Sequence, residues 1–147
     1  MGRSGRVVRL ALEGGFRDRG TDRSTARQNH KVPFDITAFE PSVRVSDAEW
    51  VALGLAWTAG PIQPNYGKAY TSANFEGVGL LAEIQVWETG EVELGTVRLT
   101  DGRIVNKHYD LASVADLDIL LADLIALARH GAVPPNAVVT HVSDPRP

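Results

Sequence analysis

Residues 78–95 read VGLLAEIQVWETGEVELG, and this stretch decides the fold of the chain. Apolar side chains occupy every second position of its first half, which is the two-residue period of a half-buried β-strand. Gly90 then predicts a three-residue loop with a G1 bulge, in which the glycine adopts a left-handed conformation. This loop joins two apolar faces, because it pairs Val86 with Val92 and Ile84 with Leu94.

Further strands are predicted on both sides of this hairpin. Asp101 and Gly102 predict a type I′ turn, after which residues 103–109 form the next strand. Residues 69–75 precede the hairpin as a strand, and residues 61–68 have the composition of a loop. Shorter strands are expected over residues 6–12, 36–40 and 137–142. Because tight turns join the central strands, the topology is an antiparallel meander and not a parallel βαβ arrangement.

Two stretches predict helices. Ser113 caps a helix over residues 114–130, whose leucines form a broad apolar face. Ser46 and Glu49 fit a capping box before a shorter helix over residues 47–57. The fold class is therefore α+β, with an antiparallel β-meander packed on one face by a C-terminal helix and a shorter helix before the sheet.

The charge of the chain is divided unevenly along its 147 residues. Residues 1–31 carry a net charge of +5, whereas residues 32–147 carry −8. We expect a flexible basic N-terminal arm over 1–31, a single domain over 32–142 and a loose tail over 143–147. Three explanations of the arm stay open: it contacts nucleic acid, it lies on the protein's own acidic surface, or the true start of the protein is near Val32.

Composition and motifs exclude several classes of function. The chain has no Cys, so it has no disulfide, thiolate metal site or cysteine nucleophile. It lacks a phosphate-binding loop, a zinc-protease motif, a nucleophile elbow and a dinucleotide fingerprint. No apolar run is long enough to span a membrane, and no secretory signal opens the chain. These absences predict a cytoplasmic protein without a cofactor, a metal site, a catalytic residue or a membrane partner.

Candidate contact residues lie on the sheet face opposite Val86 and Leu94, near the hairpin turns and in the 61–75 loop. On the predicted register this face is polar, and it is either a solvated or partner-facing surface or a functional cluster. Acidic residues near the hairpin turns add charge that attracts a basic partner. Tryptophan and tyrosine are preferred contact residues at protein interfaces, although a tryptophan here has packing as its alternative role. The candidate partner contacts are Tyr66, Tyr70, Glu83, Trp87, Glu88, Glu91, Glu93 and His108.

Residues 82–127 resemble a cassette found in small bacterial immunity proteins of polymorphic toxin systems. The residues that carry the resemblance are AEIQVWETGEVEL, then DGRIVNKHYDL, and then the Ser-capped, leucine-rich helix. The resemblance implies a cytosolic protein without enzymatic activity that neutralises a toxin by binding it. The acidic body fits a basic target such as a nuclease toxin.

Two other classes of function remain open beside a protein-binding inhibitor of a basic partner. The chain also fits a structural or assembly component, for example of a phage particle, whose basic arm packs onto neighbouring subunits. A small-ligand-binding domain or an enzyme would instead use the 61–75 loop. Its pocket would lie between the 47–57 helix and the sheet, lined by Tyr66, Tyr70, Glu83 or His108.

Overall fold

An antiparallel sheet of seven strands forms one layer of the protein. The structure is a computed structural model, and it describes residues 33–142. The predictions for residues 1–31, with their 6–12 strand, and for the 143–147 tail lie outside the described residues. The strand order is β1-β3-β4-β5-β6-β7, and β2 pairs with β3. The strands are β1 (Ala56–Ala59), β2 (Gln63–Asn65), β3 (Lys68–Glu76), β4 (Leu80–Trp87), β5 (Glu91–Arg98), β6 (Arg103–Asp110) and β7 (Val138–His141).

The predicted register of the central hairpin is confirmed. Val86 pairs with Val92 and Ile84 pairs with Leu94, so the apolar residues of β4 and β5 share one face. Gly90 has a φ of 90° and donates its N–H to the carbonyl of Trp87 at 2.9 Å. The left-handed glycine therefore closes the three-residue loop as the bulge requires.

The next turn differs from the predicted type I′ turn. Arg98 pairs with Arg103, so the loop between β5 and β6 has four residues. Gly102 has a φ of 72°, whereas a type I′ turn requires a positive φ at Asp101 as well. The Asp101 carboxylate holds the wider loop, since it accepts hydrogen bonds from the Arg98 guanidinium at 2.7 Å and from the Arg103 N–H at 3.1 Å.

The prediction of a strand over residues 36–40 is wrong. This segment forms the 3₁₀ turn η2 (Ile36–Ala38) and the start of α3 (Phe39–Val45). Asp35 begins the turn, because its carboxylate accepts a hydrogen bond from the Thr37 N–H at 3.1 Å. Phe39 and Val43 lie four residues apart and are both buried, which is helical rather than strand spacing.

The helix predicted over 47–57 is shorter than expected. It forms α4 (Asp47–Ala52), and Ser46 makes no side-chain capping bond. The chain turns at Gly54, and Trp57 belongs to β1. The Trp57 indole still reaches back to the helix, because its N–H donates to the Asp47 carboxylate at 2.7 Å.

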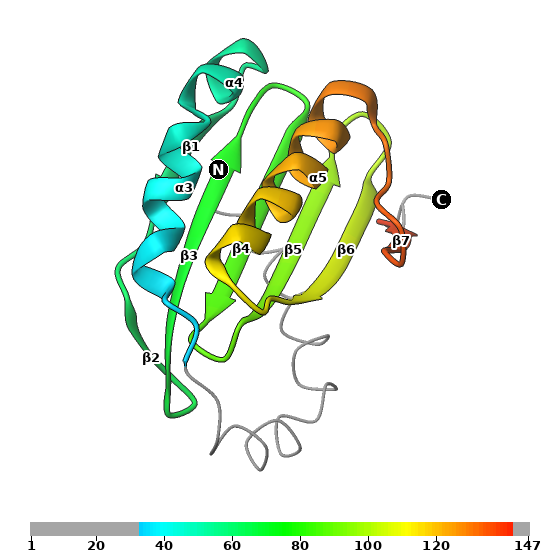
Figure 1. The fold of residues 1–147 in the computed structure, drawn as a ribbon. Coiled ribbons are helices and arrows are strands. Elements are labelled where there is room, and N and C mark those ends of the chain that lie inside the picture. The colour runs from blue at the N-terminus through cyan, green and yellow to red at the C-terminus, as the bar shows by residue number, and fades with distance from the viewer. Residues whose placement is uncertain (1–32, 143–147) are drawn as a thin grey trace.

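The C-terminal helix is confirmed with a modified first turn. Ser113 and Asp116 form a reciprocal capping box at the 3₁₀ turn η3 (Val114–Asp116), which leads into α5 (Leu117–His130). Figure 1 shows the helices on one face of the sheet, with α5 across the central strands. The core lies between these two layers and includes Phe75, which packs 4.9 Å from the ring of Trp50. The α+β architecture predicted from the sequence is therefore confirmed.

Candidate functional site

The sheet face opposite α5 brings most of the candidate contact residues together, and we call it the polar face. Its members alternate along each strand with residues of the core, as the register predicts. Gln85 pairs with Glu93, which in turn pairs with His108, so that the three side chains form one row across β4, β5 and β6. The polar face comprises Tyr70, Ser72, Asn74 and Glu76 of β3, Leu81, Glu83, Gln85 and Trp87 of β4, Glu91, Glu93, Gly95 and Val97 of β5, and Ile104, Asn106, His108 and Asp110 of β6.

His108 is held between two carboxylates. Its Nδ1 lies 2.6 Å from Glu93 Oε2, and its Nε2 lies 2.9 Å from Asp110 Oδ1. Burial alone would lower the pKa of the imidazole, but the hydrogen bonds with Glu93 and Asp110 raise it above its usual value. Only the imidazolium form donates from both ring nitrogens, so this geometry favours a positively charged His108.

An aromatic cluster lies at the β4–β5 turn end of the polar face. The rings of Tyr70 and Trp87 are 5.2 Å apart, and the Gln85 amide donates to the Tyr70 hydroxyl at 3.2 Å. The Trp87 indole donates to the Asn65 amide oxygen at 3.3 Å. Trp87 is only 2% exposed, which favours the packing role over that of an exposed contact residue.

Three carboxylates of the polar face are buried. Glu83, Glu91 and Glu93 are 1%, 5% and 4% exposed. Lys68 Nζ lies 3.6 Å from Glu91 Oε1, and the Glu93 carboxylate contacts His108. The helices described within residues 33–142 lie on the opposite face of the sheet (Figure 1). The burial of these three residues excludes a solvated surface at their positions, and the alternative of a partner-facing surface stays a prediction.

The most exposed candidate contact is Tyr66, in a hairpin that the sequence did not reveal. The predicted 61–68 loop contains β2, and Asn65 pairs with Lys68 across a two-residue turn. Tyr66 and Gly67 both have positive φ, of 55° and 78°, which makes a type I′ turn. Tyr66 is 75% exposed at its tip. The usual Asn-Gly or Asp-Gly signal is absent here, and the glycine at the second position was the available clue.

Glu88 is half-buried at the nearby β4–β5 turn. Its backbone carbonyl accepts a hydrogen bond from the Phe34 N–H at 2.7 Å, and its own N–H donates to the Ala69 carbonyl at 2.9 Å. The first described residues, at Phe34, therefore lie next to Glu88. Tyr66, Glu88 and the exposed Asp110 lie at the same end of the sheet, and we call these three residues the rim.

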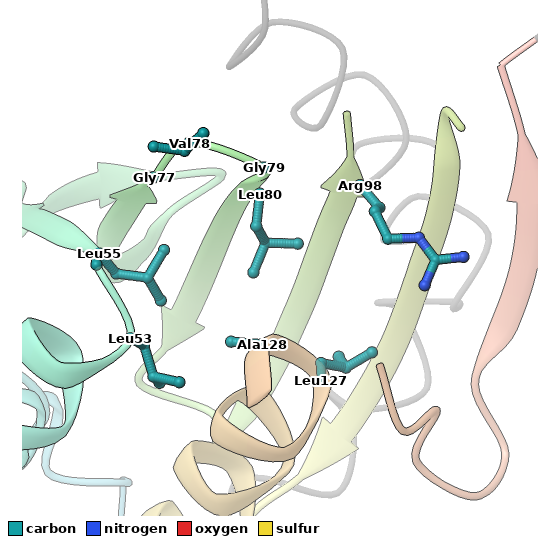
Figure 2. Close-up of a pocket in the computed structure, with 10 residues that line it drawn as sticks. Leu53, Leu55, Gly77, Val78, Gly79, Leu80, Arg98, Leu127 and Ala128 are labelled. Carbon is teal, nitrogen blue, oxygen red and sulfur yellow. The ribbon is translucent and has the colours of Figure 1, made fainter. Parts of the chain in front are cut away.

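An apolar pocket of about 240 Å³ lies elsewhere in the molecule. Figure 2 shows Leu53, Leu55 and Leu80 around it, with Leu127 and Ala128 of α5 below it and Arg98 at its edge. Residues of the predicted 61–75 loop do not line this pocket, and neither do Glu83 or His108. This cavity lies between the predicted 47–57 stretch and the sheet, where a pocket was expected, but its lining differs from the predicted one.

Metal sites and membrane-spanning helices were also sought among the described residues. Within 33–142, no group of three or more His, Asp or Glu side chains is arranged to hold a metal ion. The helices of this part of the chain are all too short or too polar to cross a membrane.

Residues 61–127 match the family model of immunity protein TriTu. The resemblance to immunity proteins predicted from residues 82–127 is confirmed by this match. No curated protein and no solved structure matches the chain. The TriTu match spans β2 to β6, η3 and most of α5, which are the elements that build and support the polar face. All eight candidate contact residues lie inside it, and the match supports an inhibitory binding protein of the immunity type.

Proposed function

We propose that this protein neutralises a toxin by binding it, as an immunity protein does, and that its partner is basic. The observation that carries the proposal is the TriTu match over residues 61–127, the region that contains the polar face and its rim. The proposal keeps the cytoplasmic location that the resemblance implies. It assigns no catalytic residue, because the chemistry of the rim is that of a contact surface.

The rim has the properties of a contact surface for a basic protein. Tyr66 presents a large, rigid side chain at the tip of a tight turn, where it contributes area at low entropic cost. Glu88 and the exposed Asp110 add negative charge beside it. The −8 charge of residues 32–147 accelerates encounter with a positively charged partner at low salt.

The test is co-expression of the full chain with the toxic products of the genes adjacent to its own. We expect rescue of growth and a stoichiometric complex in size-exclusion chromatography. Tyr66→Ala and Glu88→Lys should weaken the complex about tenfold each, which corresponds to about 1.4 kcal/mol. Asp118→Lys is the matched control, because it makes the same charge change as Glu88→Lys at an exposed position of α5 on the opposite face.

Two outcomes would overturn the proposal. One is the absence of binding to any of these products at micromolar concentration. The other is a ring or large oligomer of the purified chain without toxin binding, which would favour the assembly role. If Asp118→Lys weakens the complex as much as Glu88→Lys does, the contact surface is not at the rim.

A further inference from the structure

The two edges of the sheet differ in their protection. At the edge beyond β3, β1 and β2 follow one another with Pro61 between them, and β2 itself contains Pro64. Proline has no N–H, so it hinders the addition of a further strand. The opposite edge is β7, which reads Val-Val-Thr-His and contains no proline and no Lys, Arg, Asp or Glu. Among the strands described within 33–142, β7 pairs with β6 alone, and Figure 1 shows it beyond β6.

The exposed side chains at this edge are largely apolar. Val138, Val139 and Val142, the residue that follows the strand, are 61%, 42% and 49% exposed. Val138 pairs with Asn106 and so lies on the polar face, and Val142 lies on the same face two alternations later. Val139 lies on the other face. An exposed edge strand with aliphatic side chains on both faces is a template for pairing with another chain.

The backbone of β7 presents outward hydrogen-bonding groups at two residues. The Val142 N–H donates to the Gly102 carbonyl at 2.9 Å, so the backbone of Val142 faces the β6 side. In an antiparallel ladder every second residue bonds to the same neighbour, so the backbone of Thr140 faces β6 as well. The N–H and C=O groups of Val139 and His141 therefore point away from the sheet.

These outward groups are complementary to their own copies under two-fold symmetry. When the axis passes at Thr140, Val139 of one copy lies opposite His141 of the other, and each such pair exchanges two hydrogen bonds. Thr140 then lies opposite Thr140 of the second copy, and threonine pairs are favourable across antiparallel strands. On the polar face the same register places Val138 opposite Val142, so the exposed aliphatic side chains cover one another.

We propose that β7 is the contact surface of a homodimer, in which two copies of β7 pair antiparallel about a two-fold axis at Thr140 and join their sheets. α5 lies over the central strands and leaves this edge accessible (Figure 1). The assembly closes at two copies, because the pairing uses both β7 edges and the prolines protect the opposite edges.

The dimer keeps the rim free in both copies. β7 pairs with residues 103–106 at the start of β6, whereas Asp110 of the rim ends that strand. Each dimer therefore presents two separate rims. If the proposed function holds, one dimer binds two toxin molecules.

The dimer is expected to be weak, because each copy contributes one strand of four residues. Stable protein interfaces bury about 1,200–2,000 Å² in total, and a contact of this size lies at or below that range. We therefore expect a dissociation constant of about 10–100 µM, measured by sedimentation equilibrium of the full chain.

Single cysteines test the register, because the chain has no native Cys. A non-hydrogen-bonded pair brings two Cα atoms to about 4.5 Å, within the range of about 4.4–6.8 Å that a disulfide spans. Thr140→Cys should therefore form a covalent dimer about tenfold faster than Thr58→Cys, which places an exposed cysteine on β1 at the opposite edge. Val138→Cys and Val142→Cys should cross-link more in an equal mixture than either variant does alone. Non-reducing electrophoresis after mild oxidation measures both results.

A pair of proline variants tests the contact without a cysteine. Val139→Pro removes one outward N–H from each copy, so we expect the dissociation constant of the dimer to rise about tenfold. The bonds between β7 and β6 stay in place in this variant, so its urea unfolding midpoint should stay close to that of the wild type. Thr140→Pro is the matched control, because it removes an N–H that faces β6 and should lower the midpoint.

Several results would overturn the proposal. One is a chain that stays monomeric up to about 1 mM, well above the expected dissociation constant. Another is equal cross-linking of Thr140→Cys and Thr58→Cys, or a dimer that Val139→Pro leaves unchanged, since the copies would then meet elsewhere. A monomer whose Val139 and His141 amides are protected from hydrogen exchange would show that another segment of the same chain covers β7. These experiments contain no toxin, so their failure leaves the proposed neutralising function untouched.

Discussion

Gly90→Ala should destabilise the protein strongly, because Gly90 combines a left-handed backbone with a close approach to another segment. Its φ is 90°, and a Cβ added there would lie 2.5 Å from the backbone oxygen of Leu111. Leu111 has little freedom to move away, since its own N–H donates to the Gly90 carbonyl at 2.8 Å. The clash therefore involves two backbones that are already bonded to each other.

The expected cost has two parts, and a control separates them. A left-handed conformation costs an L-residue about 1–2 kcal/mol. Overpacking against an immobile neighbour adds about 1–3 kcal/mol. Gly67→Ala contains the first part alone, because Gly67 has a φ of 78° and no atom lies within 4 Å of the added Cβ. We therefore expect Gly90→Ala to cost about 2 kcal/mol more than Gly67→Ala.

The measurement is urea unfolding of the full chain and of both variants, followed by tryptophan fluorescence. The two variants should share the slope of the wild type, so that the midpoints report stability alone. Equal losses of stability in the two variants would refute the reasoning, because the contact with Leu111 would then contribute nothing. A larger loss in Gly67→Ala would refute it more strongly.

Three further substitutions have expected outcomes. His108→Gln should lower stability most at acidic pH, because the pKa of His108 is raised in the folded state. The stabilisation is complete below the unfolded pKa of about 6.5 and is lost as the pH rises through the folded pKa. Urea unfolding midpoints measured across that pH range test this. Trp50→Phe should lower the free energy of unfolding by about 1–3 kcal/mol, because it removes the buried hydrogen bond of 2.8 Å from the indole N–H to the Val43 carbonyl. Thermal unfolding measures this loss. Tyr109→Phe should cost about 1–2 kcal/mol in the same assay, because it removes the hydroxyl that donates to the Asp123 carboxylate at 2.6 Å and so connects β6 to α5.

The sheet was predictable because its signals are local and agree with one another. Alternation of apolar residues identified β4, and Gly90 specified the loop that pairs Val86 with Val92. The predicted 47–57 helix is too long because Trp50 and Trp57 have the seven-residue spacing of one helix face. In the structure they pack against the same residue, Phe75, from two different elements. Sequence spacing alone does not separate these two arrangements, since tertiary packing decides between them.

The candidate site was predictable in its membership but not in its environment. Strand alternation and the β4–β5 turn were enough to place Glu83 and Glu93 on one face. His108 was placed on the same face although the β5–β6 turn has four residues and not two, because a shift of two residues does not change the face. Their burial was not predictable, since it depends on what lies over the sheet and not on the strands. Tyr66 was recognised as a contact residue for its type, whereas the hairpin that exposes it has no strong sequence signal.

The alternation of the strands also separates stability from binding in this protein. Ile84 faces the helices and belongs to the core, whereas Glu83 and Gln85 on either side of it face the other way. A substitution at the rim therefore leaves the core packing intact, so that Glu88→Lys should weaken partner binding without a matching loss of stability. Loss of binding with an unchanged unfolding midpoint is accordingly the signature of a contact residue here, and loss of both is the signature of a structural one.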